Sequence, residues 1–415
     1  MAEYSDWAVW KSLVCAGGLR VTGVATGAAG GQRMVERCKA SGGALTQDRI
    51  ETGSMPDIAS TRPAKLPSLD LGRFAAAFLV VLYHMGITVH NFTGAKPFDM
   101  AFRGGHSGVA YFFVLSGFII VYVHRVDLGV STRLANFARK RIVRIVPLLW
   151  LTMIGWGAIR LFVPGGTGNA LQPDAILWDC LLLPHDSESV IGAVWTLRRE
   201  AIFYLLFAVA IFDRRVGIAL LVAWQLGVVI QAIHPFFALG PEPQMLLGIH
   251  NLGFGIGMLL ALAIPARPLA CHRLLITVGL LLYAGIMVAE WRYGSGVSEV
   301  DVGLGETLNT LAYLVASGLI VAGMVSRDIL VPRPSSALGT KLGDSSYALY
   351  LTQGPVGSVA IRLFKPIWGL VPPEVLMLLL SATTVVAAIA INRLIEKPLV
   401  QLMRGRPPRL VPSQG

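Results

Sequence analysis

Apolar stretches of about 20 residues recur along this chain between residues 70 and 395. A stretch of that length, folded as an α-helix, crosses the hydrocarbon core of a bilayer, so each one is a candidate membrane span. Two of these spans are weaker by hydropathy, because 195–212 carries charges near its start and 345–363 is interrupted by Gly354-Pro355. The full set of ten is 71–90, 108–124, 144–163, 195–212, 216–235, 244–264, 274–290, 306–325, 345–363 and 373–393.

The composition agrees with a membrane protein and excludes a soluble globular enzyme. Charged residues make up only 14% of the 415 positions, whereas an ordinary soluble domain has about 25%. The mean hydropathy is +0.63. A soluble chain of this length would need more charge to cover its surface. The sequence therefore predicts an all-α, polytopic integral membrane protein with about ten transmembrane helices.

Lysine and arginine are concentrated in alternate loops. If residue 70 is cytoplasmic, the inner loops hold the basic clusters at 125–144, 214–215, 267–273 and 327–341, and the C-terminal segment is basic as well. Cytoplasmic loops of membrane proteins are enriched in Lys and Arg, so both termini are predicted to be cytoplasmic. The net charge of +11 belongs to this bias, and we expect no nucleic-acid partner.

The first 60 residues differ from the rest of the chain. They are rich in Gly, Ala and Ser, and their one apolar stretch, 12–30, is interrupted by Arg20. This segment lacks the basic start and the longer apolar core of a signal peptide. We expect a disordered tail at 1–60, with Met55 as an alternative start and 1–54 dispensable, a membrane domain at 61–400 and a basic cytoplasmic tail at 401–415. The four cysteines include no CxxC pair, so no disulfide framework and no metal site are expected.

Two polar side chains in the first apolar stretch fall on one helix face. Arg73 and His84 are eleven residues apart, which brings them to nearly the same face at a separation of roughly 16 Å along the axis. Titratable residues inside a membrane helix are costly to bury and are candidates for function. The structural alternative is that Arg73 reaches the interface and that His84 bonds a neighbouring helix.

Arginines in the first inner loop are spaced for phosphate binding. Arg141 and Arg144 are three residues apart, so on a helix their side chains point the same way. A guanidinium group binds phosphate oxygens through two parallel hydrogen bonds. The alternative is that both residues only contribute to the positive charge of the inner face.

Glu200 lies in the outer part of the fourth apolar stretch. Its depth is similar to that of His84, so the two side chains could meet. A carboxylate beside an imidazole orients the ring and makes it a stronger base, as general-base catalysis requires. The structural alternative is an ion pair of Glu200 with Arg198 or Arg199.

Four weaker signals concern local structure. His106 lies in a glycine-rich outer turn and is expected to be solvated, and Ser116-Gly117 would permit close helix packing. Asp344 is expected to cap the ninth span, and the IEKP sequence at 395–398 is expected to end the tenth.

At these residues the chain resembles the acyltransferase 3 family of bacterial membrane proteins. The matching motifs occur in order across 66–398: the Arg73/His84 pair, GVAYFFVLSGFII (108–120), RKRIVRIVP (139–147), WTLRREAIFYLLF (195–207) and SYALYL (346–351) followed by Pro355. The family has about ten membrane helices, and 61–400 would be its acyltransferase domain. Gln353 stands where the family often has histidine, so the resemblance does not extend a proton relay to the ninth span.

The resemblance implies O-acylation of a cell-surface polysaccharide, an exopolysaccharide or its lipid-linked precursor, in the inner membrane of a bacterium. Acyl-CoA, most often acetyl-CoA, would be the cytoplasmic donor substrate, with no permanently bound cofactor. Arg73, Arg141 and Arg144 would bind the CoA phosphates. His84, supported by Glu200, would deprotonate the acceptor hydroxyl or carry the acyl group covalently.

A proton-coupled transporter of a small solute is the alternative function. Intramembrane Arg, His and Glu residues are typical of such carriers, and Gly354-Pro355 could mark a broken helix. No matching pair of Gly/Pro-broken helices occurs in two halves of the sequence, and the order of the motifs favours the acyltransferase.

Overall fold

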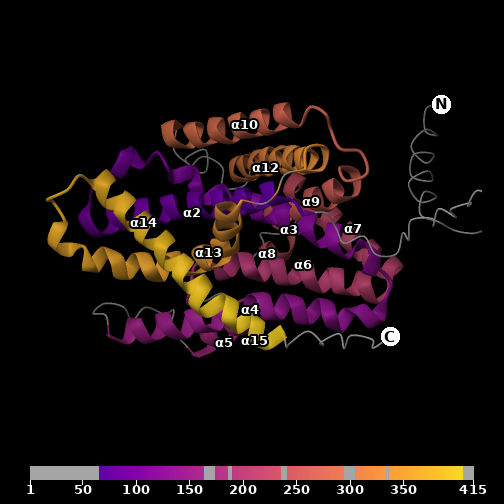
Figure 1. Ribbon diagram of the computed structural model, residues 1–415, viewed down its shortest axis with the longest axis horizontal. Coiled ribbons are helices and arrows are strands. Elements are labelled where there is room, and N and C mark those ends of the chain that lie inside the picture. Colours follow the sequence, from indigo (N-terminus) through magenta and orange to yellow (C-terminus); the bar gives the residue numbers. More distant parts are fainter. Residues whose placement is uncertain are drawn as a thin grey trace, which may run out of the picture. The chain divides into compact units, whose positions relative to one another are not determined.

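A computed structural model describes residues 65–162, 173–185, 189–234, 241–293, 304–332, 334 and 336–404. The predicted tail at 1–60 and positions 405–415 lie outside the described residues, whereas 401–404 belong to a helix. The described part of the chain is built from α-helices joined by turns (Figure 1). The helices are α2 (Pro67–Thr93), α3 (Gly108–His124), α4 (Leu134–Phe162), α5 (Pro173–Leu181), α6 (Val194–Phe212), α7 (Arg214–Ile233), α8 (Pro241–Leu247), α9 (Leu252–Ala263), α10 (His272–Tyr293), α12 (Leu304–Leu330), α13 (Ala337–Leu363), α14 (Pro373–Ile391) and α15 (Lys397–Arg404).

Short helical turns connect several of these helices. The 3-10 turns are η2 (Pro97–Met100), η3 (Arg103–Ser107), η4 (Arg125–Asp127), η5 (Ser131–Arg133), η7 (Ile249–Asn251) and η8 (Lys365–Ile367). A π turn, η9 (Asn392–Glu396), joins α14 to α15.

The long helices confirm the predicted fold class, an all-α polytopic membrane protein. Within the described ranges, eight helical segments are long and apolar enough to cross a membrane. The two weaker predicted spans, 195–212 and 345–363, are also helices, α6 and α13, but they are not among the eight apolar segments. The number ten and the cytoplasmic position of both termini stay predictions. We call the end of each helix that is expected to face the cytoplasm its inner end.

Helix α13 is continuous, which corrects the predicted interruption at Gly354-Pro355. The helix runs from Ala337 through Pro355 to Leu363. Proline removes one backbone donor but is tolerated in membrane helices when neighbouring helices support the backbone, and Pro355 is buried. The predicted cap Asp344 is also wrong. Ser336 caps the helix instead, because its side chain accepts from the Gly339 amide at 2.9 Å.

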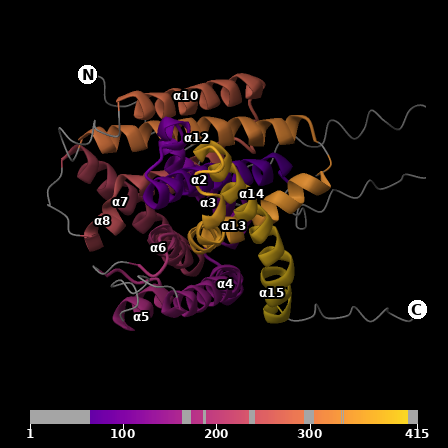
Figure 2. The same ribbon diagram turned by 90° about the vertical axis from the view of Figure 1, so that its left-hand side faces the viewer.

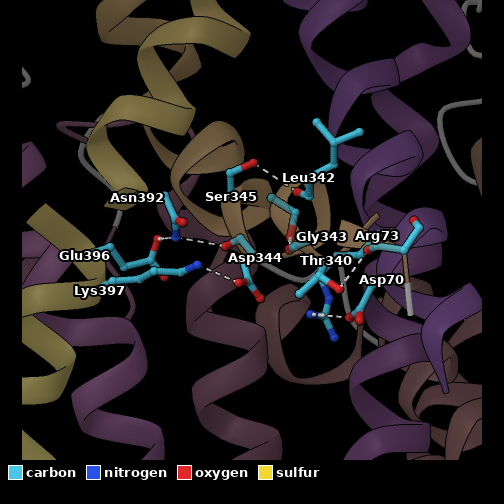
Figure 3. A network of polar contacts seen from close by, with 12 residues as sticks. Asp70, Arg73, Thr340, Leu342, Gly343, Asp344, Ser345, Asn392, Glu396 and Lys397 are labelled. Atoms are coloured by element: carbon cyan, nitrogen blue, oxygen red, sulfur yellow. Dashed lines mark hydrogen bonds and ion pairs between the residues drawn. The ribbon is translucent and has the colours of Figure 1, made fainter. Parts of the chain in front are cut away.

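The IEKP sequence does not end the tenth span. Figure 1 shows α14 and α15 following one another along one long diagonal path. Pro398 has no N–H to continue the helical ladder, and the helix passes this point with a π turn just before it. The turn is tied to α13, because Asn392 Nδ2 donates to the Asp344 carbonyl at 3.0 Å and Lys397 pairs with the Asp344 carboxylate at 2.7 Å (Figure 3).

Helix α2 lies against α3, α12, α13 and α14. It runs parallel to α13, since Gly343 packs on Asp70 near the inner ends and Gly357 packs on Met85 further out. Helices α10 and α12 lie side by side in both views (Figures 1 and 2). Because the two helices run parallel, residues of α2 and α13 can be compared by their depth from the inner end.

Glycines allow α3 and α9 to pack backbone to backbone, as predicted for Gly117. A Cβ atom built on Gly117 would lie 2.2 Å from the Phe254 carbonyl oxygen, and one on Gly257 would lie 2.0 Å from the Val114 carbonyl oxygen. Neither backbone can move aside as a flexible side chain could. This contact therefore needs glycine on both helices.

The buried apolar residues form two cores. One is built mainly from residues of α3, α6, α7, α9, α10 and α12, with further residues of α2, α4 and α13. The other contains residues of α2, α4, α6, α13 and α14. Phe112, Ala193 and Tyr204 pack against both. The cavity described next lies where the two cores meet, because its walls come from helices of each.

Candidate active site

A cavity of about 460 Å³ is lined by residues of α2, α3, α4, α6, α13 and α15. Cavities of this size are in the range that holds small molecules. Four of the five predicted site residues line it: Arg73, Arg141, Arg144 and Glu200. Its α3 wall extends from Val109 to Ile120, which is roughly 16 Å along the helix axis. The cavity therefore reaches deep into the helix bundle.

The polar lining is strongly basic. Besides the three predicted arginines, the cavity is lined by Arg139, Lys140 and Arg404, with Glu200 as the one carboxylate among the described lining residues. All six basic residues come from the inner ends of α2 and α4 or from α15. The outer part of the lining is apolar and aromatic, with Val109, Phe112, Phe113 and Leu197 among its residues. An anionic group is therefore attracted to the inner end.

Arg73 faces the cavity from the first turns of α2. Its guanidinium lies 3.6 Å from the carboxylate of Asp70, one turn earlier (Figure 3). The Arg73 side chain is 19% exposed, so it lies largely buried at the inner end of the cavity. Phosphate binding by Arg73 stays a prediction.

Arg141 is held by two polar side chains in sequence and by two aromatic rings. Its Nη2 donates to His124 Nε2 at 3.1 Å, and His124 Nδ1 donates to the Asp127 carboxylate at 2.8 Å. The rings of Phe137 and Tyr204 each have their centroid 5.6 Å from the guanidinium carbon. His124 is only 3% exposed. Arg141 is therefore fixed in orientation, as binding through a planar fork requires. Neither His124 nor Asp127 was predicted from the sequence, although their spacing of three residues at a helix end was visible.

Glu200 has partners other than the predicted His84. Its carboxylate accepts from Ser116 Oγ at 3.0 Å and from the Tyr204 hydroxyl. The alternative partners of Glu200 are engaged elsewhere. Arg198 binds Asp179, and Arg199 stacks on Trp195 at 4.9 Å. Glu200 thus joins α3 and α6 beside Tyr204, the residue that stacks on Arg141.

His84 does not line the cavity. It is half-buried in α2, where its Nδ1 bonds the Val80 carbonyl at 2.9 Å. Similar depth did not bring it to Glu200, because the two side chains also have to face each other around their helix axes. Helix α2 packs most extensively on α13, and also on α3, η3 and α14. The ring of Tyr83 lies 4.9 Å from that of His84. The same tyrosine lies 5.5 Å from His106, so His84 belongs to an outer group of residues.

The outer group also contains a carboxylate that the sequence analysis missed. Glu290 ends a predicted span and is 6% exposed, with its Oε1 3.5 Å from His106 Nε2. The signal was visible, because Glu290 is an acidic residue at the edge of an apolar stretch. His106, expected to be solvated, has a side chain that is 47% exposed.

Comparisons with known proteins agree with the sequence motifs. The acyltransferase domain family matches residues 66–393. The chain is similar to the exopolysaccharide production protein ExoZ of Rhizobium meliloti, with 27% identity over 344 residues, covering 76% of this chain and 96% of the relative. It is also similar to the acyltransferase MdmB of Streptomyces mycarofaciens, with 26% identity over 386 residues, covering 84% of this chain and 95% of the relative. No solved structure matches the chain.

Proposed function

Because the chain belongs to the acyltransferase family, we propose that it moves an acetyl group from acetyl-CoA to a hydroxyl of a cell-surface polysaccharide, an exopolysaccharide or its lipid-linked precursor. The proposed location is the inner membrane of a bacterium, with the donor on the cytoplasmic side. The observation that carries the proposal is a deep cavity with a basic inner end and an apolar outer end. The similarity to an exopolysaccharide production protein supports this acceptor class.

The donor fits the distribution of charge in the cavity. The CoA phosphates would bind at the inner end, where Arg73, Arg141 and Arg144 meet the basic residues of α4 and α15. The uncharged pantetheine arm would follow the apolar wall of α3, which is roughly 16 Å long. This orientation brings the thioester to the outer end of the cavity. Glu200 would contribute by holding Tyr204 against Arg141.

The reaction needs a base near the acceptor hydroxyl. The hydroxyl oxygen attacks the thioester carbonyl, the C–S bond breaks, and CoA leaves as the thiolate while a base takes the hydroxyl proton. His84 would be this base, or it would carry the acyl group between donor and acceptor. His84 lies further out on α2 than Arg73, so in either route the acyl group passes the outer end of the cavity. Thr196 and Tyr350 are hydrogen-bonded there at 2.8 Å.

The transporter alternative loses one of the two features that suggested it, the broken helix. A broken helix at Gly354-Pro355 would be typical of a carrier, but α13 runs unbroken through Pro355. A chemical assay separates the two functions. The purified protein in detergent is given radiolabelled acetyl-CoA and the surface polysaccharide of the source bacterium, freed of its esters by mild alkali. We expect free CoA and label on the glycan. No CoA release and no labelled glycan would contradict the proposal.

A further inference from the structure

A second polar site is present on the outer side, away from the cavity. Glu290, near the outer end of α10, is only 6% exposed, and its carboxylate accepts from Asn309 Nδ2 and from the Tyr313 hydroxyl, the latter at 3.0 Å. His106 Nε2 lies 3.5 Å from the same carboxylate. Burying a carboxylate among membrane helices is costly unless it has partners. Four side chains from η3, α10 and α12 therefore converge here.

The η3 turn is shaped around this carboxylate. A Cβ atom on Gly104 would lie 2.6 Å from Glu290 Oε2 and 2.8 Å from the Tyr313 hydroxyl. Only glycine lets the turn approach so closely. Ser107, at the end of the turn, is hydrogen-bonded to the Tyr283 hydroxyl at 2.7 Å. The turn is thereby anchored at both ends, with His106 between the anchors.

His106 is the exposed member of this group. Its side chain is 47% exposed, against 6% for Glu290. With Nε2 directed at the carboxylate, the other ring nitrogen, Nδ1, remains to accept a hydrogen bond. The ring of Tyr83 lies 5.5 Å from His106 and 4.9 Å from His84. One tyrosine thus connects the exposed imidazole with the proposed catalytic base.

We propose that His106, Glu290 and Tyr83 form the binding site for the acceptor glycan. This inference rests on the proposed function. It gives the acceptor a binding site on the outer side, whereas the cavity is the proposed binding site of the donor. A sugar is a neutral polyhydroxyl compound with an apolar C–H face. The imidazole of His106 accepts a hydrogen bond from one hydroxyl, Glu290 fixes the tautomer that makes this possible, and Tyr83 offers a ring to the C–H face. The bound hydroxyl then lies next to His84, on the side from which a glycan arrives.

The test compares the two substrates. His106→Gln and Glu290→Gln keep hydrogen-bonding groups in place but remove the imidazole or the charge. His90→Gln is the matched control, because His90 is another half-buried histidine near the outer end of α2. Among the described contacts its side chain is hydrogen-bonded only to the Ala95 carbonyl, at 3.2 Å. The measurements are the KM for the de-esterified polysaccharide of the source bacterium and the Kd for CoA, both in detergent.

We expect both test variants to raise the KM for the polysaccharide by roughly 3- to 10-fold, the effect of one lost hydrogen bond, with the Kd for CoA unchanged. The control should match the wild type in both. An unchanged KM for the polysaccharide overturns the inference. A parallel rise in the Kd for CoA also overturns it, because the group would then be a structural clamp. If the wild type transfers no acyl group to the glycan, the proposed function itself has failed.

Discussion

The three-residue chain Asp127–His124–Arg141 should set the affinity for the donor. In His124→Phe the ring volume is kept, but Arg141 loses the acceptor that lies 3.1 Å from its Nη2. Removing a hydrogen bond to a charged group costs about 1.5–3 kcal/mol, and each 1.4 kcal/mol is about tenfold in affinity. Phe137 and Tyr204 still hold the guanidinium at 5.6 Å. We therefore expect the lower end of that range, a rise of about tenfold in the KM for acetyl-CoA with kcat nearly unchanged.

The assay for the Asp127–His124–Arg141 contacts compares three variants with the wild type. Initial rates at varied acetyl-CoA are measured for the wild type, His124→Phe and His124→Gln, whose amide can still accept from Arg141. His272→Phe is the control, because this histidine begins α10 and lies outside the cavity lining. His124→Gln should recover part of the affinity for acetyl-CoA, and the control variant should have the same KM as the wild type. If Arg141→Lys raises the KM while His124→Phe leaves it unchanged, the chain does not position Arg141.

Three further predictions follow from the other residues. Arg144→Lys keeps the charge but not the planar fork, so it should raise the KM for acetyl-CoA by roughly 3- to 10-fold; an unchanged KM would leave Arg144 with a topological role only. His84→Ala should lower kcat by about 10²- to 10⁴-fold with normal amounts of protein in the membrane, and near-normal transfer would exclude His84 as the base or acyl carrier. Gly117→Ala should cost at least roughly 1–3 kcal/mol of stability, because its Cβ would meet the Phe254 carbonyl oxygen at 2.2 Å. Gly354→Ala, where a Cβ meets nothing within 4 Å, should be neutral or stabilising in the same thermal unfolding assay in detergent.

The sequence predicted what depends on length and hydropathy. An apolar run of about 20 residues has few structures open to it in a bilayer, so the long helices could be located without a structure. The inner arginines could also be placed together. Arg73, Arg141 and Arg144 all lie at inner helix ends, where any inward-facing side chain reaches the same region. Their convergence on one cavity therefore needed little information about helix rotation.

The pairing of His84 with Glu200 required information about helix rotation, which a sequence lacks. Depth in the membrane can be estimated from residue counts, but the direction of a side chain depends on which helices pack together. Glu200 faces Ser116 on α3, whereas His84 lies beside Tyr83 toward the outer turn. The continuity of α13 was missed for a related reason, since the support for Pro355 comes from the helices around it.

We propose that the donor binds at the inner end of the cavity and that the acyl group leaves at its outer end. Proteoliposomes test it most directly, with the de-esterified polysaccharide sealed inside and radiolabelled acetyl-CoA added only outside. Molecules whose basic cavity faces the added donor should label the enclosed polysaccharide, and Arg141→Lys should weaken this labelling at low acetyl-CoA. Label on the polysaccharide only when it is on the same side of the membrane as acetyl-CoA would contradict acyl transfer from the inner to the outer end.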